Sequence, residues 1–332
     1  MKDCKPIKVM QESWDYLIIL DACRYDYFEK VWRNYFSEGQ LLCKHSVGSC
    51  TDEWRDKSFP DYYDDIVYIT ANPQINVSSR VFGYLASEHF KSIHEIWRES
   101  WDERSGTVLP DVVSRRARDI ILQYPPNMRY IIHYLQPHAP YLSVTYSRKS
   151  KTLQEFNQFL IDPDKENSPM TIRLRLFRFL LPLFKKNRFL TNHPEWLLRK
   201  YLGISPKGPM EIAWRELGIK GLRKAYQENL EIALRSVASL VDQLSGTIII
   251  TSDHGDLLGE DRQFAHPKGS QHPTLRQVPW LVIKKEKKIN FHNVSDKMIV
   301  PMSSKNTDTI NKDDKNHQDQ TVIERLRALG YY

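Results

Sequence analysis

The 332-residue sequence has no apolar run long enough to span a membrane, and its first residues lack the apolar core of a secretion signal. The longest apolar runs have only the length of single β-strands. Cysteine is scarce, and the four cysteines do not have the paired spacing of a zinc finger: Cys4, Cys23, Cys43 and Cys50. These absences exclude a membrane-spanning protein and a zinc-finger module. They predict a cytoplasmic chain whose cysteines stay reduced.

A large excess of charge of one sign is also absent, because 48 Lys and Arg face 41 Asp and Glu, a net charge of +7. The excess is local: residues 143–224 hold 17 basic and 7 acidic residues, so the remainder is slightly acidic. A locally basic region favours an anionic partner, such as a phosphate or sulfate ester or a membrane surface. Nucleic acid is the weakest alternative, since the sequence contains no recognised nucleic-acid-binding motif.

Two short apolar segments each lead into an aspartate. Residues 16–20 (Tyr-Leu-Ile-Ile-Leu) precede Asp21, and residues 247–251 (Thr-Ile-Ile-Ile-Thr) lead to Asp253 and His254. Such runs are typical of strands that are buried on both faces of a sheet. One aspartate after a strand is often only a turn or a helix cap. Two of them, with an adjoining imidazole, favour a divalent metal site at the carboxyl ends of neighbouring strands.

Strands and helices alternate along the chain. Further strands are expected at residues 41–46, 66–70, 130–135 and 280–283. Helices are expected at residues 24–35, 108–123 and 221–244. The alternation predicts an α/β fold with a mostly parallel central β-sheet flanked by helices.

The whole chain, residues 1–332, is expected to form one domain with two interruptions. Residues 145–215 are basic and irregular, and we interpret them as a helical cap over the site, with peripheral membrane contact as the alternative. Residues 303–320 are polar and predict a flexible loop.

Histidines in loops provide further candidates. His138 follows the strand expected at 130–135, and His266 and His272 follow the Asp253 segment. A lone loop histidine is usually a surface residue. The position after strands that already carry candidate ligands favours a functional role for His138 and His266 but not for His272.

Five segments occur in a fixed order along the chain. They are Ile-Leu-Asp-Ala-Cys-Arg-Tyr-Asp (19–26), Gly-Ser-Cys-Thr (48–51), His-Tyr-Leu-Gln-Pro-His-Ala-Pro-Tyr (133–141), Thr-Ser-Asp-His-Gly-Asp (251–256) and Ala-His-Pro (265–267). This set resembles the alkaline phosphatase superfamily, and most closely its sulfatase-like branch. The segment Glu-Arg-Leu-Arg-Ala-Leu-Gly-Tyr (324–331) is also similar to the way many members end. The resemblance implies an α/β sandwich with its metal site at the strand ends.

The resemblance also implies the ligands and the nucleophile. Asp21, Asp253 and His254 would bind a divalent metal ion, and Thr51 would complete the ligand shell as the nucleophile. A threonine hydroxyl becomes nucleophilic when a metal or a base lowers its pKa. Ser49 is the alternative nucleophile. We expect one firmly bound ion, with Zn, Mn, Mg and Ca open as its identity and a second ion also open.

The remaining site residues are implied in the same way. His138 and His266 match positions that contact the charged group of the substrate or a second metal, and either can protonate the leaving oxygen. Lys268 would neutralise the transferred group. Residues 50–54 do not form the Cys-x-Pro-x-Arg motif of formylglycine sulfatases, which argues against sulfate ester hydrolysis. Gln136 stands near the position of a second-metal carboxylate, where an amide is a weaker ligand.

These features predict a metal-dependent hydrolase that forms a covalent threonine intermediate, with phosphate esters as the expected substrates and sulfate esters as the alternative. The first alternative is a transferase of phosphoglycerol or phosphoethanolamine type that acts on a glycan or a lipid. The second is a catalytically inactive sulfatase-like binding protein. The expected partner is an anionic ester, for which the resemblance suggests a phosphorylated or sulfated glycan.

Overall fold

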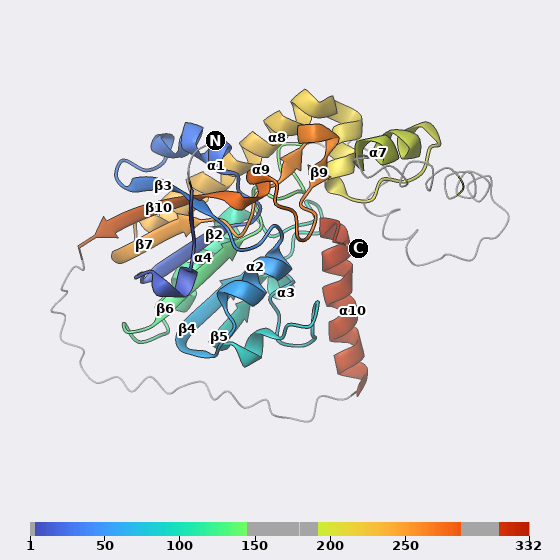
Figure 1. The fold of residues 1–332 in the computed structure, drawn as a ribbon. Helices are drawn as coiled ribbons and strands as arrows, with labels where there is room; N and C mark the ends of the chain where they lie inside the picture. Colours follow the sequence, from blue (N-terminus) through green and yellow to red (C-terminus); the bar gives the residue numbers. More distant parts are fainter. Residues whose placement is uncertain (1–3, 145–178, 180–191, 287–311, 332) are drawn as a thin grey trace.

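Eight strands form one sheet in a computed structural model, which describes residues 4–144, 179, 192–286 and 312–331 (Figure 1). In spatial order the strands are β1 (Lys5–Pro6), β3 (Gln40–His45), β10 (Gln277–Lys285), β7 (Gly246–Thr251), β2 (Tyr16–Leu20), β6 (Arg129–Tyr134), β4 (Tyr63–Thr70) and β5 (Phe90–Glu95). Only β10 is antiparallel to its neighbours, β3 and β7. The expected α/β fold with a mostly parallel sheet is therefore confirmed.

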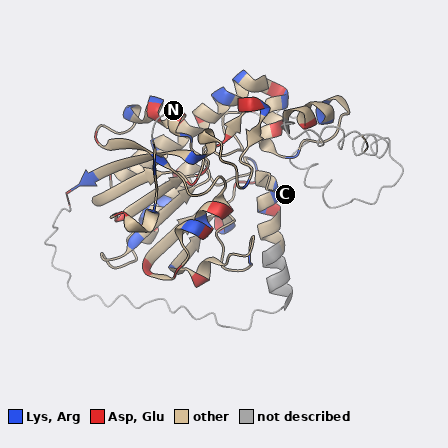
Figure 2. Cartoon of the chain, in the orientation of Figure 1, with Lys and Arg blue, Asp and Glu red and all other residues tan. Residues whose placement is uncertain are grey.

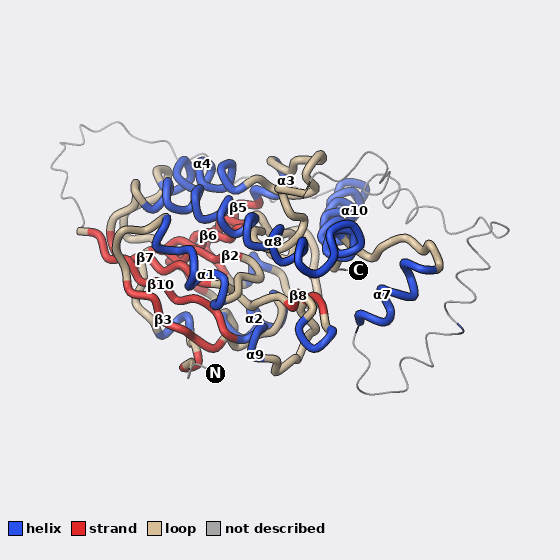
Figure 3. Tube along the Cα trace, turned by 90° about the horizontal axis from the view of Figure 1, so that it is seen from above, coloured by secondary structure: helices blue, strands red, loops and turns tan. Residues whose placement is uncertain are grey.

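Helices cover both faces of this sheet (Figure 3). One face packs against α1 (Tyr25–Val31), α4 (Pro110–Ile121), α8 (Pro209–Val241) and the end of α10 (Lys312–Leu329). The opposite face packs against α2 (Thr51–Ser58) and the segment around the first strand. The shorter elements are α3 (Ile96–Glu99), α7 (Asn192–Tyr201), β8 (Leu257–Leu258), β9 (Phe264–Ala265) and α9 (Pro273–Arg276).

Strand β2 shows why these residues form a central strand. Leu17 and Ile19 point into one apolar cluster, and Ile18 and Leu20 point into the other. Successive side chains of a strand point to opposite faces, so an unbroken apolar run suits a strand that is covered on both sides. Burial of each such side chain contributes roughly 1.5–3 kcal/mol. The described charged residues lie mainly on the outer helices, the loops and the strand ends (Figure 2).

The region expected as a basic cap is described only in part, because residues 145–178 and 180–191 lie outside the described residues. Its last part forms α7 and the first turns of α8, which thus begins before the expected residue 221. Gly218 has a left-handed φ of 66° and separates this first part from the long helix that follows. Trp196 and Trp214 pack with Phe264 in a third apolar cluster.

The prediction of a flexible loop at residues 303–320 is wrong for residues 312–320, because these residues belong to α10, which begins at Lys312. A helix that buries Val322, Leu326 and Leu329 can propagate into a polar sequence, since each added residue gains a hydrogen bond without a new nucleation cost. Residues 303–311 lie outside the described residues. Strand β5 was not expected, since its sequence Phe-Lys-Ser-Ile-His-Glu has the mixed pattern of an edge strand.

The reduced state expected for all four cysteines is also wrong. Cys4 and Cys43 form a disulfide that links the chain next to β1 to β3. Cys23 and Cys50 are buried free thiols. Among the described helices, none has the length and apolar character needed to cross a membrane.

Candidate active site

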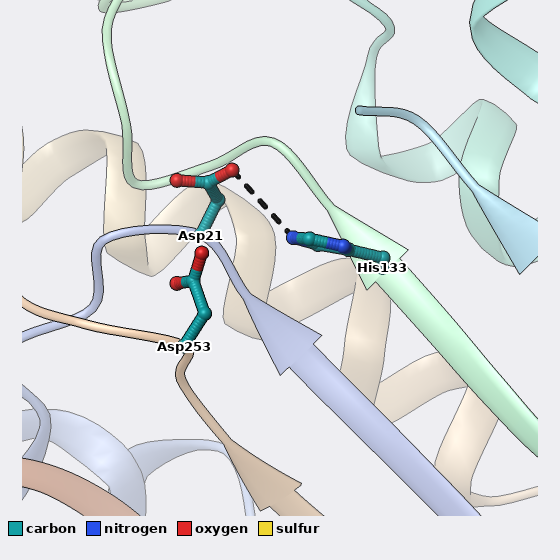
Figure 4. Close-up of side chains that lie close together, drawn as sticks. All are labelled: Asp21, His133 and Asp253. Carbon is teal, nitrogen blue, oxygen red and sulfur yellow. Dashed lines mark ion pairs between the residues drawn. The ribbon is translucent and has the colours of Figure 1, made fainter. Parts of the chain in front are cut away.

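The carboxyl ends of three parallel strands bring Asp21, His133 and Asp253 together (Figure 4). Asp21 follows β2, His133 lies near the end of β6, and Asp253 follows β7. Strand β2 lies between the other two, so all three residues meet at one edge of the sheet. One ligand atom from each residue lies within 4.8 Å of the others, and all three side chains are fully buried.

These residues fit a divalent metal ion. Asp21 Oδ1 and His133 Nε2 are buried and have no hydrogen-bond partner within the described part of the chain. Burial alone would raise the pKa of Asp21, but His133, whose Nε2 lies 3.5 Å from Oδ2, and the nearby His138 and His254 lower it below its ordinary value. The side chain is therefore a carboxylate. Carboxylate oxygen with imidazole nitrogen is a donor set that suits Zn or Mn.

Thr51 and His254 complete this group. The Thr51 hydroxyl donates a hydrogen bond to Asp253 Oδ2 at 2.8 Å and lies 3.3 Å from His254 Nε2. The other ring nitrogen of His254, Nδ1, lies 2.8 Å from the carbonyl oxygen of Gly255. A proton on Nδ1 leaves the Nε2 lone pair directed toward Thr51 and Asp253, which is how ligating histidines are commonly oriented. The expected metal set Asp21, Thr51, Asp253 and His254 is thus brought into one place.

Thr51 is the first residue of α2, whose N-cap is Cys50. The amide groups of a first helical turn favour negative charge, so this end of the helix suits an anionic group bound at Thr51. Gly48 allows the preceding turn to approach the helix closely, because a Cβ atom there would lie 2.4 Å from the backbone nitrogen of Trp54. The sequence Gly-Ser-Cys-Thr therefore places the hydroxyl at the sheet edge.

Close packing also fixes the Asp253 loop. A Cβ atom on Gly255 would lie 2.1 Å from the carbonyl oxygen of Thr274, so the Asp-His-Gly sequence requires glycine at its third position. Ala22 has a positive φ of 59° and donates its amide hydrogen to Asp253 Oδ1 at 3.0 Å. A left-handed alanine costs roughly 1–3 kcal/mol, and such strain is often found beside functional residues.

His138 and His266 form the second part of the site. Their ring centres lie 5.2 Å apart, and the ring of His266 lies 4.5 Å from that of His254. Burial lowers the pKa of His138. Burial would also lower the pKa of His266, but its hydrogen bond and charge interaction with Asp256 raise it. His266 Nδ1 lies 3.2 Å from Asp256 Oδ1. The two expected histidines therefore have opposite protonation tendencies.

The two remaining expected residues, Lys268 and Ser49, make contacts outside the group formed by Thr51, Asp253 and His254. Lys268 is exposed and pairs with Asp52 Oδ2 at 2.5 Å, at the edge of the site. The Ser49 hydroxyl lies against Glu53 and the carbonyl oxygen of Pro267, away from Asp253.

Gln136 is held against residues 107–108. Its amide nitrogen donates to the hydroxyl of Thr107 and to the carbonyl oxygen of Val108.

Four residues of the site did not enter the predicted set: His133, Asn72, Asp256 and Tyr331. Asn72 Nδ2 donates to Asp21 Oδ2 at 2.6 Å and so orients that carboxylate. The sequence pointed to His133 only as a polar residue next to the apolar pair Ile131 and Ile132 of β6. Asp256 was noted only as the last residue of the motif at 251–256, and Asn72 only as part of a turn after a strand. Tyr331 was noted only as part of the final motif, without a role.

A cavity of about 540 Å³ opens beside the site. His138, His266 and Lys268 line one side of it. Apolar side chains line much of the rest, and they come from separate elements: Phe82, Trp196, Met210, Phe264 and Leu329. The volume is within the range of small-molecule sites. The cavity thus offers room for the organic part of a substrate.

No family model matches this sequence, and no curated protein shows significant similarity to it. Solved structures do show a similar fold. The soluble domain of lipooligosaccharide phosphoethanolamine transferase A from Neisseria meningitidis is 10% identical with a TM-score of 0.45, covering 80% of this chain and 75% of that chain. A zinc complex of the C-terminal periplasmic domain of EcEptC from Escherichia coli is 12% identical with a TM-score of 0.45, covering 86% and 78%. An alkaline phosphatase superfamily protein from Vibrio parahaemolyticus is 9% identical with a TM-score of 0.42, covering 85% and 62%.

At these identities the similarity concerns the fold alone. The expectation of a cytoplasmic protein was based on reduced cysteines and is corrected, because Cys4 and Cys43 form a disulfide. The EptC structures of similar fold are periplasmic domains.

Proposed function

We propose that this protein is a metal-dependent enzyme that takes a phospho group from an ester onto Thr51 and passes it to an alcohol acceptor. The observation that carries the proposal is the contact of the Thr51 hydroxyl with Asp253 and His254 at the start of α2. A hydroxyl that donates to a carboxylate, beside an imidazole lone pair, is arranged to lose its proton and attack.

The metal would be held by Asp21, His133, Asp253 and His254. When bound, it would supply Lewis-acid stabilisation of negative charge and lower the pKa of the Thr51 hydroxyl. Asn72 holds the Asp21 carboxylate in its orientation. These ligands are all anchored at strand ends, which suits a site that must be rigid.

The reaction would have two transfers. The Thr51 oxygen forms a bond to phosphorus while the bond from phosphorus to the ester oxygen breaks, and the Thr51 proton passes to Asp253. His266, oriented by Asp256, donates a proton to the departing oxygen. An acceptor hydroxyl then attacks phosphorus while the bond from phosphorus to the Thr51 oxygen breaks, and Asp253 returns the proton to Thr51. His138 accepts the acceptor's proton at Nε2 and returns it to His266, whose ring centre lies 5.2 Å away. The Nδ1 of His138 lies against the carbonyl oxygen of Ala139, which leaves Nε2 for that task.

Phosphate is favoured over sulfate because residues 50–54 lack the formylglycine motif. Transfer to an alcohol is favoured over transfer to water by the cavity beside the site, whose apolar walls suit an organic acceptor. A transferase of phosphoglycerol or phosphoethanolamine type was already the first alternative predicted from the sequence. A phosphoethanolamine transferase is among the structures of similar fold. Hydrolysis is the second candidate, since the exposed Lys268 shows that one side of the site is open to water.

The test combines metal analysis with turnover of aryl phosphate mono- and diesters, with and without an added alcohol. We expect bound metal, release of the aryl group and alkyl phosphate as product. A phospho group on Thr51 should be detected by mass spectrometry after acid quenching. Thr51→Ala should abolish turnover and adduct, whereas the neighbouring control Ser49→Ala should retain both.

The outcomes separate the candidates. Inorganic phosphate as the sole product, whatever the alcohol, would favour the hydrolase. Turnover that survives in Thr51→Ala would refute the proposed nucleophile. A protein with neither metal nor turnover would support the inactive binding protein.

A further inference from the structure

The end of α10 directs Tyr331 into the active site. Gly330 has a φ of 91° and ends the helix, its amide donating to the carbonyl oxygen of Arg327. The amide of Tyr331 donates to the carbonyl oxygen of Leu326. These two hydrogen bonds form a Schellman motif, which needs a left-handed residue and therefore favours glycine. The chain direction after α10 is thus fixed by the helix itself.

The Tyr331 ring packs on the two site histidines. It stacks on His138 with ring centres 5.4 Å apart and planes at 12°, and it lies 5.8 Å from the ring of His266. Its hydroxyl oxygen is buried and has no hydrogen-bond partner among the residues that the structure describes. An unpaired buried hydroxyl costs roughly 1–3 kcal/mol, so a purely structural ring at this position would be more stable as phenylalanine.

The surroundings of this hydroxyl define its chemical state. Burial, followed by the charges of Asp21 and Asp253, raises the pKa of Tyr331 well above its ordinary value. The Thr51 side chain has a smaller, opposite effect and lowers this pKa. The phenol therefore keeps its proton, and loss of that proton would place a phenolate among carboxylates. Such a group can donate a hydrogen bond but is a poor proton donor for a leaving group.

We propose that Tyr331 is a catalytic residue whose phenol O–H donates a hydrogen bond to a non-bridging oxygen of the group that is transferred to Thr51. This inference rests on the proposed function. Negative charge on the non-bridging oxygens must be stabilised during transfer, and a preoriented neutral donor does so without reorganisation. No proton leaves the tyrosine, and no bond to it forms.

The experiment compares Tyr331→Phe with wild type and with Tyr84→Phe. Tyr84 is a matched control, since its hydroxyl is also buried and unpaired within the described residues, and its ring packs on Arg55 and His89 rather than on the site. The phenylalanine variant keeps the stacking on His138. We expect kcat/KM for an aryl phosphate to fall about 10²- to 10³-fold in Tyr331→Phe and to stay unchanged in Tyr84→Phe. The thermal midpoint of Tyr331→Phe should be equal or higher.

A binding measurement makes the test independent of turnover. Titration calorimetry will compare the affinities of wild type and Tyr331→Phe for two anions. The substitution should weaken the binding of vanadate, which mimics the transition state, more than the binding of inorganic phosphate. Equal loss or no loss for both anions would overturn the inference, as would faster turnover, which would indicate that Tyr331 blocks the site. If wild type turns over the aryl phosphate through Thr51 and kcat/KM of Tyr331→Phe is unchanged, only this inference fails. If wild type has no turnover, the proposed function fails and the vanadate comparison still decides the role of Tyr331.

Discussion

Asp21 Oδ2 lies 3.5 Å from His133 Nε2, and both side chains are completely buried. Each also retains an atom without a hydrogen-bond partner in the described structure. Buried polar groups are nearly always paired, so the unpaired atoms Asp21 Oδ1 and His133 Nε2 are best explained by a ligand that both residues share. His133 comes from β6, the strand next to β2, and it adds a second imidazole to the expected metal group.

The first prediction concerns this second imidazole. His133→Gln should keep a polar side chain of similar length but weaken metal binding by at least about 10- to 100-fold, because a nitrogen ligand is lost. Metal content after dialysis and the affinity measured by competition with a chelator will check it. His94→Gln on β5 is the control, since His94 contacts Tyr124 instead of the site. Equal affinity of His133→Gln and wild type would remove His133 from the metal group.

The second prediction concerns Asn229 on α8, which holds the loop that carries His138. Its amide nitrogen donates to the carbonyl oxygens of Pro137, His138 and Pro140, and its oxygen accepts from the amide of Leu142. Asn229→Ala should lower the free energy of unfolding by about 2–4 kcal/mol, because several buried groups lose their partner at once.

Urea denaturation will measure this loss. Gln227→Ala on the same helix, which removes only a contact with Glu231, should stay within about 0.5 kcal/mol of wild type. A similar small loss for Asn229→Ala would show that the loop is held by other contacts.

The central strands and the meeting of Asp21 and Asp253 were predictable because local sequence determines them. The apolar runs before Asp21 and Asp253 identify buried strands, and parallel packing brings their ends together. Thr51 was included in the expected site only because of the family resemblance. In the structure its hydroxyl lies 2.8 Å from Asp253 Oδ2.

The remaining residues depend on the tertiary structure. His133 sits inside a strand, where a lone histidine is usually part of the core, so its role emerges only from the register of β6 with β2. Tyr331 reaches the site from a helix far away in sequence, and no local pattern reveals that contact. The disulfide of Cys4 was equally hidden, because its partner lies 39 residues away on another strand.

The third prediction is a pH dependence of stability. Burial would raise the pKa of Glu260, but its ion pair with Arg24 at 2.9 Å lowers it below the ordinary value of 4.5. A lowered native pKa means that the pair stabilises the fold fully above pH 4.5 and that this contribution is lost as the pH falls from there through the lowered native pKa. Glu260→Gln should therefore cost about 1–3 kcal/mol at pH 7 and much less near pH 3.

Denaturation of wild type and Glu260→Gln at both pH values will check this dependence. Glu88→Gln serves as the control, because its pair with Arg80 is exposed and should contribute little at either pH. A constant difference between wild type and Glu260→Gln would contradict the assignment of the shift to Arg24.

The last prediction concerns the disulfide between Cys4 and Cys43. It closes a loop with a sequence separation of 39, so loss of the bond should destabilise the protein by roughly 4 kcal/mol in the chain-entropy model. Cys43→Ser should show this loss in denaturant without added reductant, whereas wild type should show it only after reduction. Thiol counting in unfolded, unreduced protein should find two free groups, those of Cys23 and Cys50. Four free thiols, together with equal stability of Cys43→Ser and wild type, would show that the two cysteines are not bonded in the isolated protein.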